Sequence, residues 1–315
     1  LLLGRPGRHH AGSGARGAQE VRRFRMGSTV LARPIGWRLG LALLAWGVAD
    51  LSAAAPNRPP ELSQVGKPGE VEAARILEQF RQAGLAGSFY LAIELRSLPR
   101  RGEERVFPGR LWGGREAGGP VFRLEVEDGQ GGVRRLILRN GVEGGVWRWA
   151  GAQVEQVAPA AAVAPLFPGV EVSAFDLQMP FLYWPEAQLE KLARAFGRPA
   201  YSYLFKAPPG FLEQGGGYAA ARAFLDTQFN ALMQTELVAA NGGVLKTFYL
   251  VSLKKVGDQY VPRQADYRNE LTRDKTRFQV TGAALNLPVP AGAFAPASLA
   301  EPWAPPAAAL VLPVE

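Results

Sequence analysis

The stretch FYLVSLKKVGDQYVPRQADYRNE, residues 248–270, is the clearest structural signal in the chain. Two runs rich in aromatic and β-branched residues flank Val256-Gly257-Asp258-Gln259, and the Gly-Asp pair supplies the backbone freedom that a tight reversal needs. The stretch therefore predicts a long β-hairpin. It contains no nucleophile motif, metal-ligand cluster or glycine-rich phosphate loop, so its role must come from its place in the fold.

Alternating apolar and polar residues recur along most of the chain after residue 87. Between residues 88 and 96, the side chains of Phe89, Leu91, Ile93 and Leu95 share one face, which predicts a half-buried strand. Glycine pairs and Asn-Gly or Asp-Gly turns separate such segments, as antiparallel meanders require. The strands predicted in this way cover residues 88–96, 106–112, 121–126, 134–139, 146–149, 201–205, 223–227, 231–239, 244–256, 259–271 and 276–282.

Helical signals occur in two parts of the chain. Residues 70–83 repeat apolar side chains at helical spacing after Pro68-Gly69, which predicts an amphipathic helix. Ser173 is placed to cap a short helix over residues 174–179, and Pro185 to begin another that continues to Ala195. The intervening apolar insert, residues 175–184, is so rich in large apolar side chains that we expect it to cover another apolar surface.

These segments together predict a mainly β (α+β) fold. We expect one strongly curved antiparallel sheet of about eleven strands, a half-barrel, with the helices covering its concave face. The hairpin at residues 248–270 then forms part of the wall of this half-barrel.

The apolar interior permits two interpretations. In the first, the sheet and the helices form an ordinary filled core. In the second, the core is incompletely filled and binds an aliphatic guest, with about 0.8 kcal/mol of binding free energy for each methylene group that is buried. A carrier of the second kind needs no catalytic residue. The candidate lipid-binding residues on the strands and the apolar insert are Phe89, Leu91, Ile93, Leu95, Phe122, Leu124, Leu136, Leu138, Phe181, Leu182 and Trp184.

The N-terminal part of the chain has the pattern of a leader. The first 54 residues carry eight arginines against Glu20 and Asp50, so the formal net charge of +8 is concentrated there and does not indicate nucleic-acid binding. Residues 26–54 combine arginines, the apolar run Leu39–Ala49 and small residues, which predicts a secretory signal peptide cleaved after Ala54. The apolar run would span roughly 16 Å as a helix, too short for a ~30 Å hydrocarbon core. A retained N-terminal anchor is the alternative.

The remaining boundaries follow from composition. Residues 1–25 are expected to be a disordered leader or an over-extended reading frame, and residues 55–69 a linker. Residues 70–294 hold the folded domain, and the Ala/Pro-rich residues 295–315 are expected to form an extended tail.

Catalysis has little support in the sequence. The chain has no cysteine, and its two histidines, His9 and His10, lie in the predicted leader, which removes thiol and Ser-His nucleophiles and the usual zinc sites. The carboxylate pairs that could serve a hydrolase are Glu125 with Glu127 and Asp266 with Glu270. Such pairs are usually solvated strand faces, so we expect no enzyme and no cofactor.

The order of elements resembles that of the LolA-like outer-membrane lipoprotein-sorting family over most of residues 70–300. The similarity is carried by AFDLQMPFLYW at residues 174–184, by KVGDQYVPRQADYRNE at residues 255–270 and by the Leu-Asn-Xaa-Pro-Val-Pro stretch that starts at Leu285. The resemblance implies an unclosed antiparallel β-barrel with a helical lid, located in the periplasm, whose apolar cavity takes the acyl chains of lipoproteins or lipids.

The same resemblance implies partners and an alternative. A carrier between membranes would meet an inner-membrane transporter and an outer-membrane acceptor, whereas other proteins with this fold serve as envelope-stress sensors or protein-binding scaffolds. The family's carriers depend on an arginine, for which Arg110 and Arg123 are the candidates in this chain.

Overall fold

The computed structural model describes residues 66–141, 144–212, 217–290 and 292–315. The predicted leader and signal peptide, residues 1–25 and 26–54, therefore lie outside the described residues. Within the described ranges, no helix combines the length and apolar character needed to cross a membrane.

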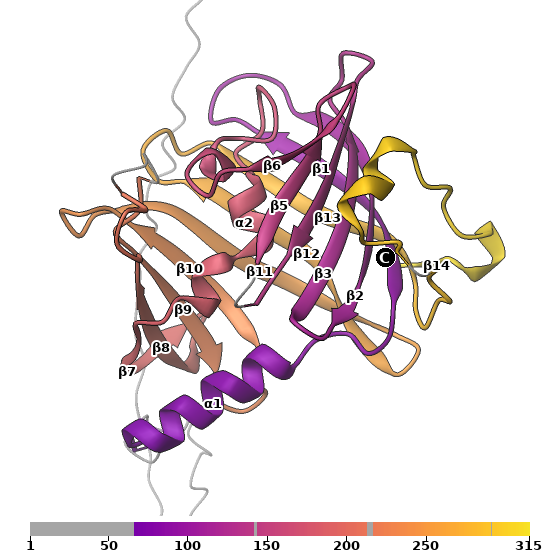
Figure 1. Cartoon of the computed structure of the whole chain (residues 1–315). Helices are drawn as coiled ribbons and strands as arrows, with labels where there is room; N and C mark the ends of the chain where they lie inside the picture. The colour runs from indigo at the N-terminus through magenta and orange to yellow at the C-terminus, as the bar shows by residue number, and fades with distance from the viewer. Residues whose placement is uncertain (1–65, 142–143, 213–216, 291) are drawn as a thin grey trace, which may run out of the picture. The chain divides into compact units, whose positions relative to one another are not determined.

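One antiparallel sheet dominates the described part of the chain (Figure 1). Its strands follow the order β6-β5-β4-β3-β2-β1-β13-β12-β11-β10-β9-β8-β7, and β14 pairs with β13 off this path. Because the path begins at β6 and ends at β7, the sheet is open. The strands are β1 (Phe89–Leu98), β2 (Arg105–Glu116), β3 (Gly119–Glu127), β4 (Val133–Arg139), β5 (Gly145–Trp149), β6 (Val154–Val157), β7 (Ala187–Ala195), β8 (Arg198–Lys206), β9 (Ala220–Asp226), β10 (Leu232–Val238), β11 (Val244–Val256), β12 (Gln259–Asn269), β13 (Lys275–Ala284) and β14 (Leu312–Pro313).

The sheet consists of two meanders joined by one long-range pairing. Strands β1–β6 and β7–β13 each run between neighbours in sequence, and the two groups meet where β1 pairs with β13. The register of that pairing runs from Tyr90 opposite Ala284 to Leu98 opposite Lys275. The predicted class, a mainly β fold with a curved, open antiparallel sheet, is confirmed.

The predicted hairpin at residues 248–270 is formed by β11 and β12. Val256 pairs with Gln259 across a two-residue turn, and Gly257 adopts a φ of 59°, which a side chain with a Cβ would disfavour. The hairpin contributes the longest strand, β11, to the wall of the half-barrel.

The helix predicted from Pro185 to Ala195 is wrong, because residues 187–195 form strand β7. Their side chains have good helix propensity, but β7 pairs with β8 from Ala187–Phe205 to Ala195–Arg198. The turn between them places Phe196 and Gly197 at φ values of 50° and 78°, the geometry of a tight hairpin. Hairpin pairing outweighs local propensity here. Strands β6, β7 and β14 were not predicted, which explains why about eleven strands were expected rather than fourteen.

The helices cover the concave face of the sheet, as predicted. Helix α1 (Glu70–Gln82) buries Ala73, Ile76 and Leu77 in the main hydrophobic core. Helix α2 (Ala174–Gln178) begins at Ser173, whose side chain accepts a hydrogen bond from the Asp176 backbone N–H in a capping box. The 3-10 helix η3 (Pro180–Tyr183) follows directly. A shorter 3-10 turn, η2 (Ala161–Val163), lies in the loop before α2.

The C-terminal residues are packed against the fold, which their composition did not indicate. The 3-10 helix η4 (Pro296–Ala300) buries Leu299 completely, in a second cluster with Tyr90, Trp112 and Ile137 of the sheet. These strand residues alternate with those of the main core, so the tail covers the convex face of β1–β4. A second 3-10 turn, η5 (Ala308–Leu310), precedes β14.

Candidate functional site

The concave face of the sheet holds an apolar cavity of about 420 Å³. Strands β1–β4 and β11–β13 form its walls, and α2 and the residues after α1 border it. Its volume lies within the range of about 300–1,000 Å³ typical of small-molecule sites. The lining includes the side chains Phe89, Leu91, Phe122, Leu138, Phe248 and Tyr267.

The predicted wall residues divide into two groups by depth. Phe89, Leu91, Phe122 and Leu138 line the cavity. In contrast, Ile93, Leu95 and Leu124 lie in the filled part of the same hydrophobic core, where Leu95 and Leu124 are completely buried. Leu136 belongs to this core as well and borders a separate pocket of about 120 Å³.

The filled part of the core is closed by the loop that precedes α2. The ring of Phe167 in this loop packs edge-on against Phe107 of β2, with ring centroids 4.9 Å apart. Val170 and Val172 are buried in the same cluster. The loop therefore plugs one end of the half-barrel, while the other end keeps the cavity.

None of the three predicted residues of the apolar insert, Phe181, Leu182 and Trp184, is among the residues that line this cavity. Phe181 and Trp184 belong to an aromatic cluster around Phe175, with ring centroids 5.9 and 6.2 Å from that ring. Leu182 is buried in the core and borders a second cavity of about 540 Å³. The two cavities share the residues that follow α1 and the tip of the β11–β12 hairpin.

The hairpin supplies an apolar rim that was not among the predicted site residues. Leu253 and Tyr260 line both cavities, although their side chains are 47% and 64% exposed. The pairing of β11 with β12 shifts register between Leu250 and Ser252, which is a β-bulge. In a regular strand, every second side chain faces the same side. The bulge interrupts this alternation, so Leu250 and Leu253, three positions apart, both face the cavity. The sequence pattern could not reveal this change of face.

Polar contacts fasten α1 over the concave face. The Tyr203 hydroxyl donates to the Ala73 carbonyl at 2.8 Å, and burial raises the pKa of Tyr203 to about 12. Arg115 Nη2 donates to the carbonyl oxygens of Arg81 and Ala83, each at 3.0 Å, at the end of the helix. Arg115 is the one charged residue among the described residues that line the cavity, and these carbonyls engage its guanidinium.

A buried ion pair fastens α2. Lys246 Nζ of β11 lies 2.7 Å from Asp176 Oδ2 and donates to the Glu171 carbonyl, and both charged side chains are less than 10% exposed. Tyr267 lines the cavity nearby, and burial raises the pKa of its phenol, which keeps this part of the wall uncharged. Apart from Arg115, the described residues that line the cavity are therefore uncharged.

The predicted carboxylate pairs do not form acid–base sites. Glu125 is buried with Oε1 2.7 Å from Arg123 Nη2, whereas Glu127 is exposed. Burial alone would raise the pKa of Asp266, but hydrogen bonds from Arg277 and Lys275 hold it below its usual value. Glu270 pairs with Arg273. Asp266 is therefore held in its charged form by two cations, which is unsuitable for a general acid, while Glu125 and Glu270 are each paired with an arginine.

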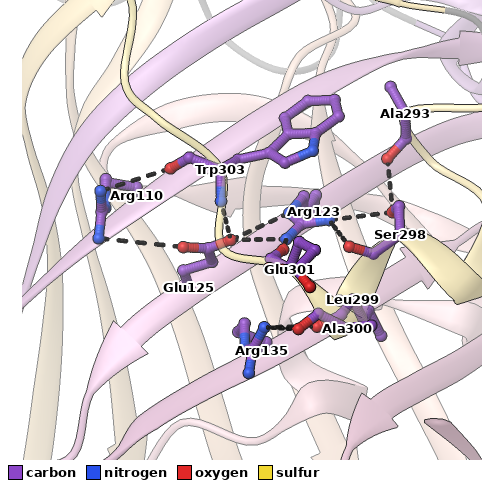
Figure 2. Close-up of polar contacts among 10 residues, drawn as sticks. All are labelled: Arg110, Arg123, Glu125, Arg135, Ala293, Ser298, Leu299, Ala300, Glu301 and Trp303. Atoms are coloured by element: carbon purple, nitrogen blue, oxygen red, sulfur yellow. Dashed lines mark hydrogen bonds and ion pairs between the residues drawn. The ribbon is translucent and has the colours of Figure 1, made fainter.

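The two candidate arginines lie away from the cavity. Figure 2 shows Arg110 and Arg123 on the strands beneath the C-terminal segment. Arg123 is completely buried, where it pairs with Glu125 and donates to the carbonyl and hydroxyl oxygens of Ser298. Its guanidinium also lies 4.9 Å from the centroid of the Trp303 ring. The arginine that does border the cavity is Arg115.

No group of three or more histidine, cysteine, aspartate or glutamate side chains that could hold a metal ion occurs in the described ranges. The amino-acid sequence matches no protein-family profile, and no curated protein is detectably similar to it.

Solved structures do show the same architecture. A domain from Vibrio parahaemolyticus assigned to outer membrane lipoprotein sorting aligns with 73% of this chain and 98% of its own, at 15% identity and a TM-score of 0.61. A LolA superfamily protein from Nitrosomonas europaea aligns with 70% of this chain and 96% of its own, at 14% identity and a TM-score of 0.54. The fold is LolA-like.

A third similar structure broadens that statement. A DUF1329 family protein from Desulfovibrio piger aligns with 74% of this chain and 100% of its own, at 11% identity and a TM-score of 0.61. At these identities the comparison establishes the LolA-like fold alone, so the activity of this chain has to be argued from its cavity.

Proposed function

We propose that this chain is an exported, periplasmic binding protein whose cavity takes an acyl chain. The observation that carries the proposal is the cavity of about 420 Å³, which is lined by aliphatic and aromatic side chains and bordered by the exposed apolar rim residues Leu253 and Tyr260. Each methylene transferred from water into such a site contributes about 0.8 kcal/mol.

The residues that line the cavity favour recognition of the acyl chain of a lipid or lipoprotein over recognition of its polar headgroup. Arg115, the charged side chain of the described lining, already donates to two helix carbonyls, and Tyr267 is held neutral. A polar headgroup would therefore remain outside, at the rim. We infer that one acyl chain enters the cavity while the rest of the lipid or lipoprotein stays in contact with water.

A carrier role between membranes follows from the same proposal. Its partners would be an inner-membrane transporter that delivers the lipid or lipoprotein and an outer-membrane acceptor that removes it. Catalysis is not part of the proposal, because the carboxylates considered for a hydrolase are either paired with cations or, in the case of Glu127, exposed.

Native mass spectrometry of the protein purified from the periplasm of its own cells tests the proposal directly. We expect a mass increment that matches a lipid or lipopeptide and that is lost after mild organic extraction. Repeated recovery of the empty protein, together with no uptake of a fluorescent fatty acid, would contradict the carrier and favour a protein-binding scaffold.

Two leucine-to-tryptophan variants separate a guest site from a filled core. Leu91→Trp adds volume in the cavity, so we expect it to abolish fatty-acid uptake while the protein stays folded. Leu124→Trp is the matched control, because Leu124 is completely buried in the filled part, where overpacking costs about 1–3 kcal/mol of unfolding free energy. Urea unfolding and fatty-acid titration measure the two effects. Equal destabilisation by both variants would mean that no guest space exists beside Leu91.

A further inference from the structure

The C-terminal loop, residues 304–313, exposes apolar side chains that contribute nothing to the core. Its sequence, APPAAALVLP, contains no charged or polar side chain. Leu310 and Leu312 are 56% and 51% exposed. Figure 1 shows the loop, in yellow, projecting away from the sheet. Large apolar side chains so close together on a surface indicate a contact site.

Buried contacts fix both ends of this C-terminal loop. Before it, the Trp303 backbone N–H donates to Glu125 Oε1 at 3.1 Å (Figure 2). After it, the backbone N–H of the buried Val314 donates to the Thr281 carbonyl at 3.0 Å, and Lys254 Nζ donates to the Glu315 carbonyl at 2.8 Å. The loop is therefore held in place at each end.

Residues within the loop alternate between inward and outward positions. Val311 points inward and packs where Gly282 of β13 leaves room, since a Cβ at that glycine would lie 2.8 Å from Val311 Cγ1. Its neighbours Leu310 and Leu312 then point outward. The inward residue positions the loop, and the two outward leucines are presented to the surroundings.

Some of the N–H groups in the loop's backbone are absent or already hydrogen-bonded. Pro305, Pro306 and Pro313 have no N–H group, and the N–H groups of Leu310 and Val311 donate to the carbonyls of Ala307 and Ala308 within the 3-10 turn. Unsatisfied backbone groups are the main cost of placing a loop in lipid. The loop avoids the part of that cost that would come from these five N–H positions.

The loop is tied to the part of the sheet that carries the cavity. Strand β14 pairs with β13 at Ala283, and Ala283 lies opposite the cavity residue Leu91 of β1. Lys254, which contacts Glu315, directly follows the rim residue Leu253.

We propose that the C-terminal loop is a membrane-contact site, in which Leu310 and Leu312 insert into the interfacial region of a lipid bilayer. A bilayer fits better than a protein partner, because the loop offers no side chain for a hydrogen bond or ion pair, and shallow insertion into the interfacial region is driven by exposed apolar area. The inference goes beyond the proposed cavity function, since the loop lies outside the cavity.

Vesicle flotation tests this proposal. Vesicles of phosphatidylethanolamine and phosphatidylglycerol should bind the wild-type chain, and Leu310→Ser with Leu312→Ser should weaken binding by about tenfold or more. The control is Val133→Ser with Leu271→Ser, which removes two apolar side chains, 44% and 75% exposed, from other segments. The wild type and the variants carry the same N-terminal residues, so the apolar run at residues 39–49 contributes equally to the vesicle binding of each.

A label placed on the loop gives a second readout. Because the chain has no cysteine, Leu312→Cys and Leu271→Cys each create a single site for an environment-sensitive fluorophore. We expect a blue shift with vesicles at position 312 and none at position 271. The proposal would be overturned if the loop variant floated with vesicles as well as the wild type does, or if the control variant lost as much binding. It would also be overturned if the label at position 312 showed no blue shift. Self-association of the wild-type chain that the double serine variant abolishes would show instead that the loop is a contact between two copies of the chain. Fatty-acid uptake, measured separately, reports on the cavity alone.

Discussion

At the scale of single residues, Arg123 is the completely buried side chain of largest volume among the described residues. Its guanidinium is completely buried, pairs with Glu125 and donates to the Ser298 carbonyl. Burial lowers the pKa of Arg123, and the hydrogen bonds to Glu125 oppose this shift. A charge in such surroundings is tolerated because its hydrogen-bond donors find acceptors in the C-terminal segment. The residue joins the sheet to the tail.

Removal of this cation should be costly. We expect Arg123→Met to lower the free energy of unfolding by about 3–5 kcal/mol, because it leaves Glu125 buried with only Arg110, 3.9 Å away, as a cation. Arg123→Met with Glu125→Met should recover part of that loss, since no uncompensated charge remains. Urea unfolding measures both. Arg148→Met, which breaks an exposed pair with Glu155, is the control and should cost at most about 1 kcal/mol. A similar cost for Arg123→Met and Arg148→Met would show that burial of the pair has no energetic consequence.

At the scale of elements, α1 is attached to the sheet by few polar contacts. Three of its residues, Ala73, Ile76 and Leu77, are buried, and Tyr203 of β8 reaches its backbone. The Asn230 side chain donates to the Ile76 carbonyl at 3.0 Å. Because these contacts are few, we expect α1 to open at a lower free-energy cost than the strands of the sheet.

Loss of one attachment should loosen this helix specifically. Tyr203→Phe removes the hydrogen bond to Ala73, which should cost about 0.5–1.5 kcal/mol and speed amide hydrogen exchange in α1 more than in β11. Tyr201→Phe, two residues earlier on β8, is the matched control. Equal acceleration in both variants, or in α1 and β11 alike, would show that this hydroxyl does not hold the helix.

At the scale of the whole molecule, the fold depends on one pairing between distant segments. Strand β1 meets β13 across almost two hundred residues of sequence, and this contact joins the two meanders into one sheet. Without it, each meander would expose its concave face. The cavity exists because strands from both meanders, and α2 between them in sequence, enclose the same space.

Export of the whole molecule is the last expectation. If residues 26–54 are a cleaved signal peptide, protein recovered from the periplasm should begin near Ala55. N-terminal sequencing checks this directly. A first residue upstream of Arg38 would contradict cleavage and favour the retained anchor.

The amino-acid sequence by itself determined the strands of the two meanders other than β6 and β7, the hairpin at residues 248–270 and the cap of α2, because side-chain alternation, turn glycines and Ser173 act locally. It also placed Leu91 and Leu124 on the same face of the sheet. It could not show that Leu91 borders a cavity while Leu124 is enclosed, because the loop that precedes α2 and fills one end of the half-barrel is distant from both residues in the sequence.

The tertiary structure alone decided the rest. Residues 187–195 have helical propensity but form β7, because pairing with β8 satisfies their backbone. Leu253 reaches the rim only through a bulge, and the tail is held by Arg123, a residue more than 170 positions away from Ser298. Alternation along a strand fixes which side chains share a face. Which part of that face is filled, covered or left open depends on contacts between segments remote in sequence, and these no local pattern encodes.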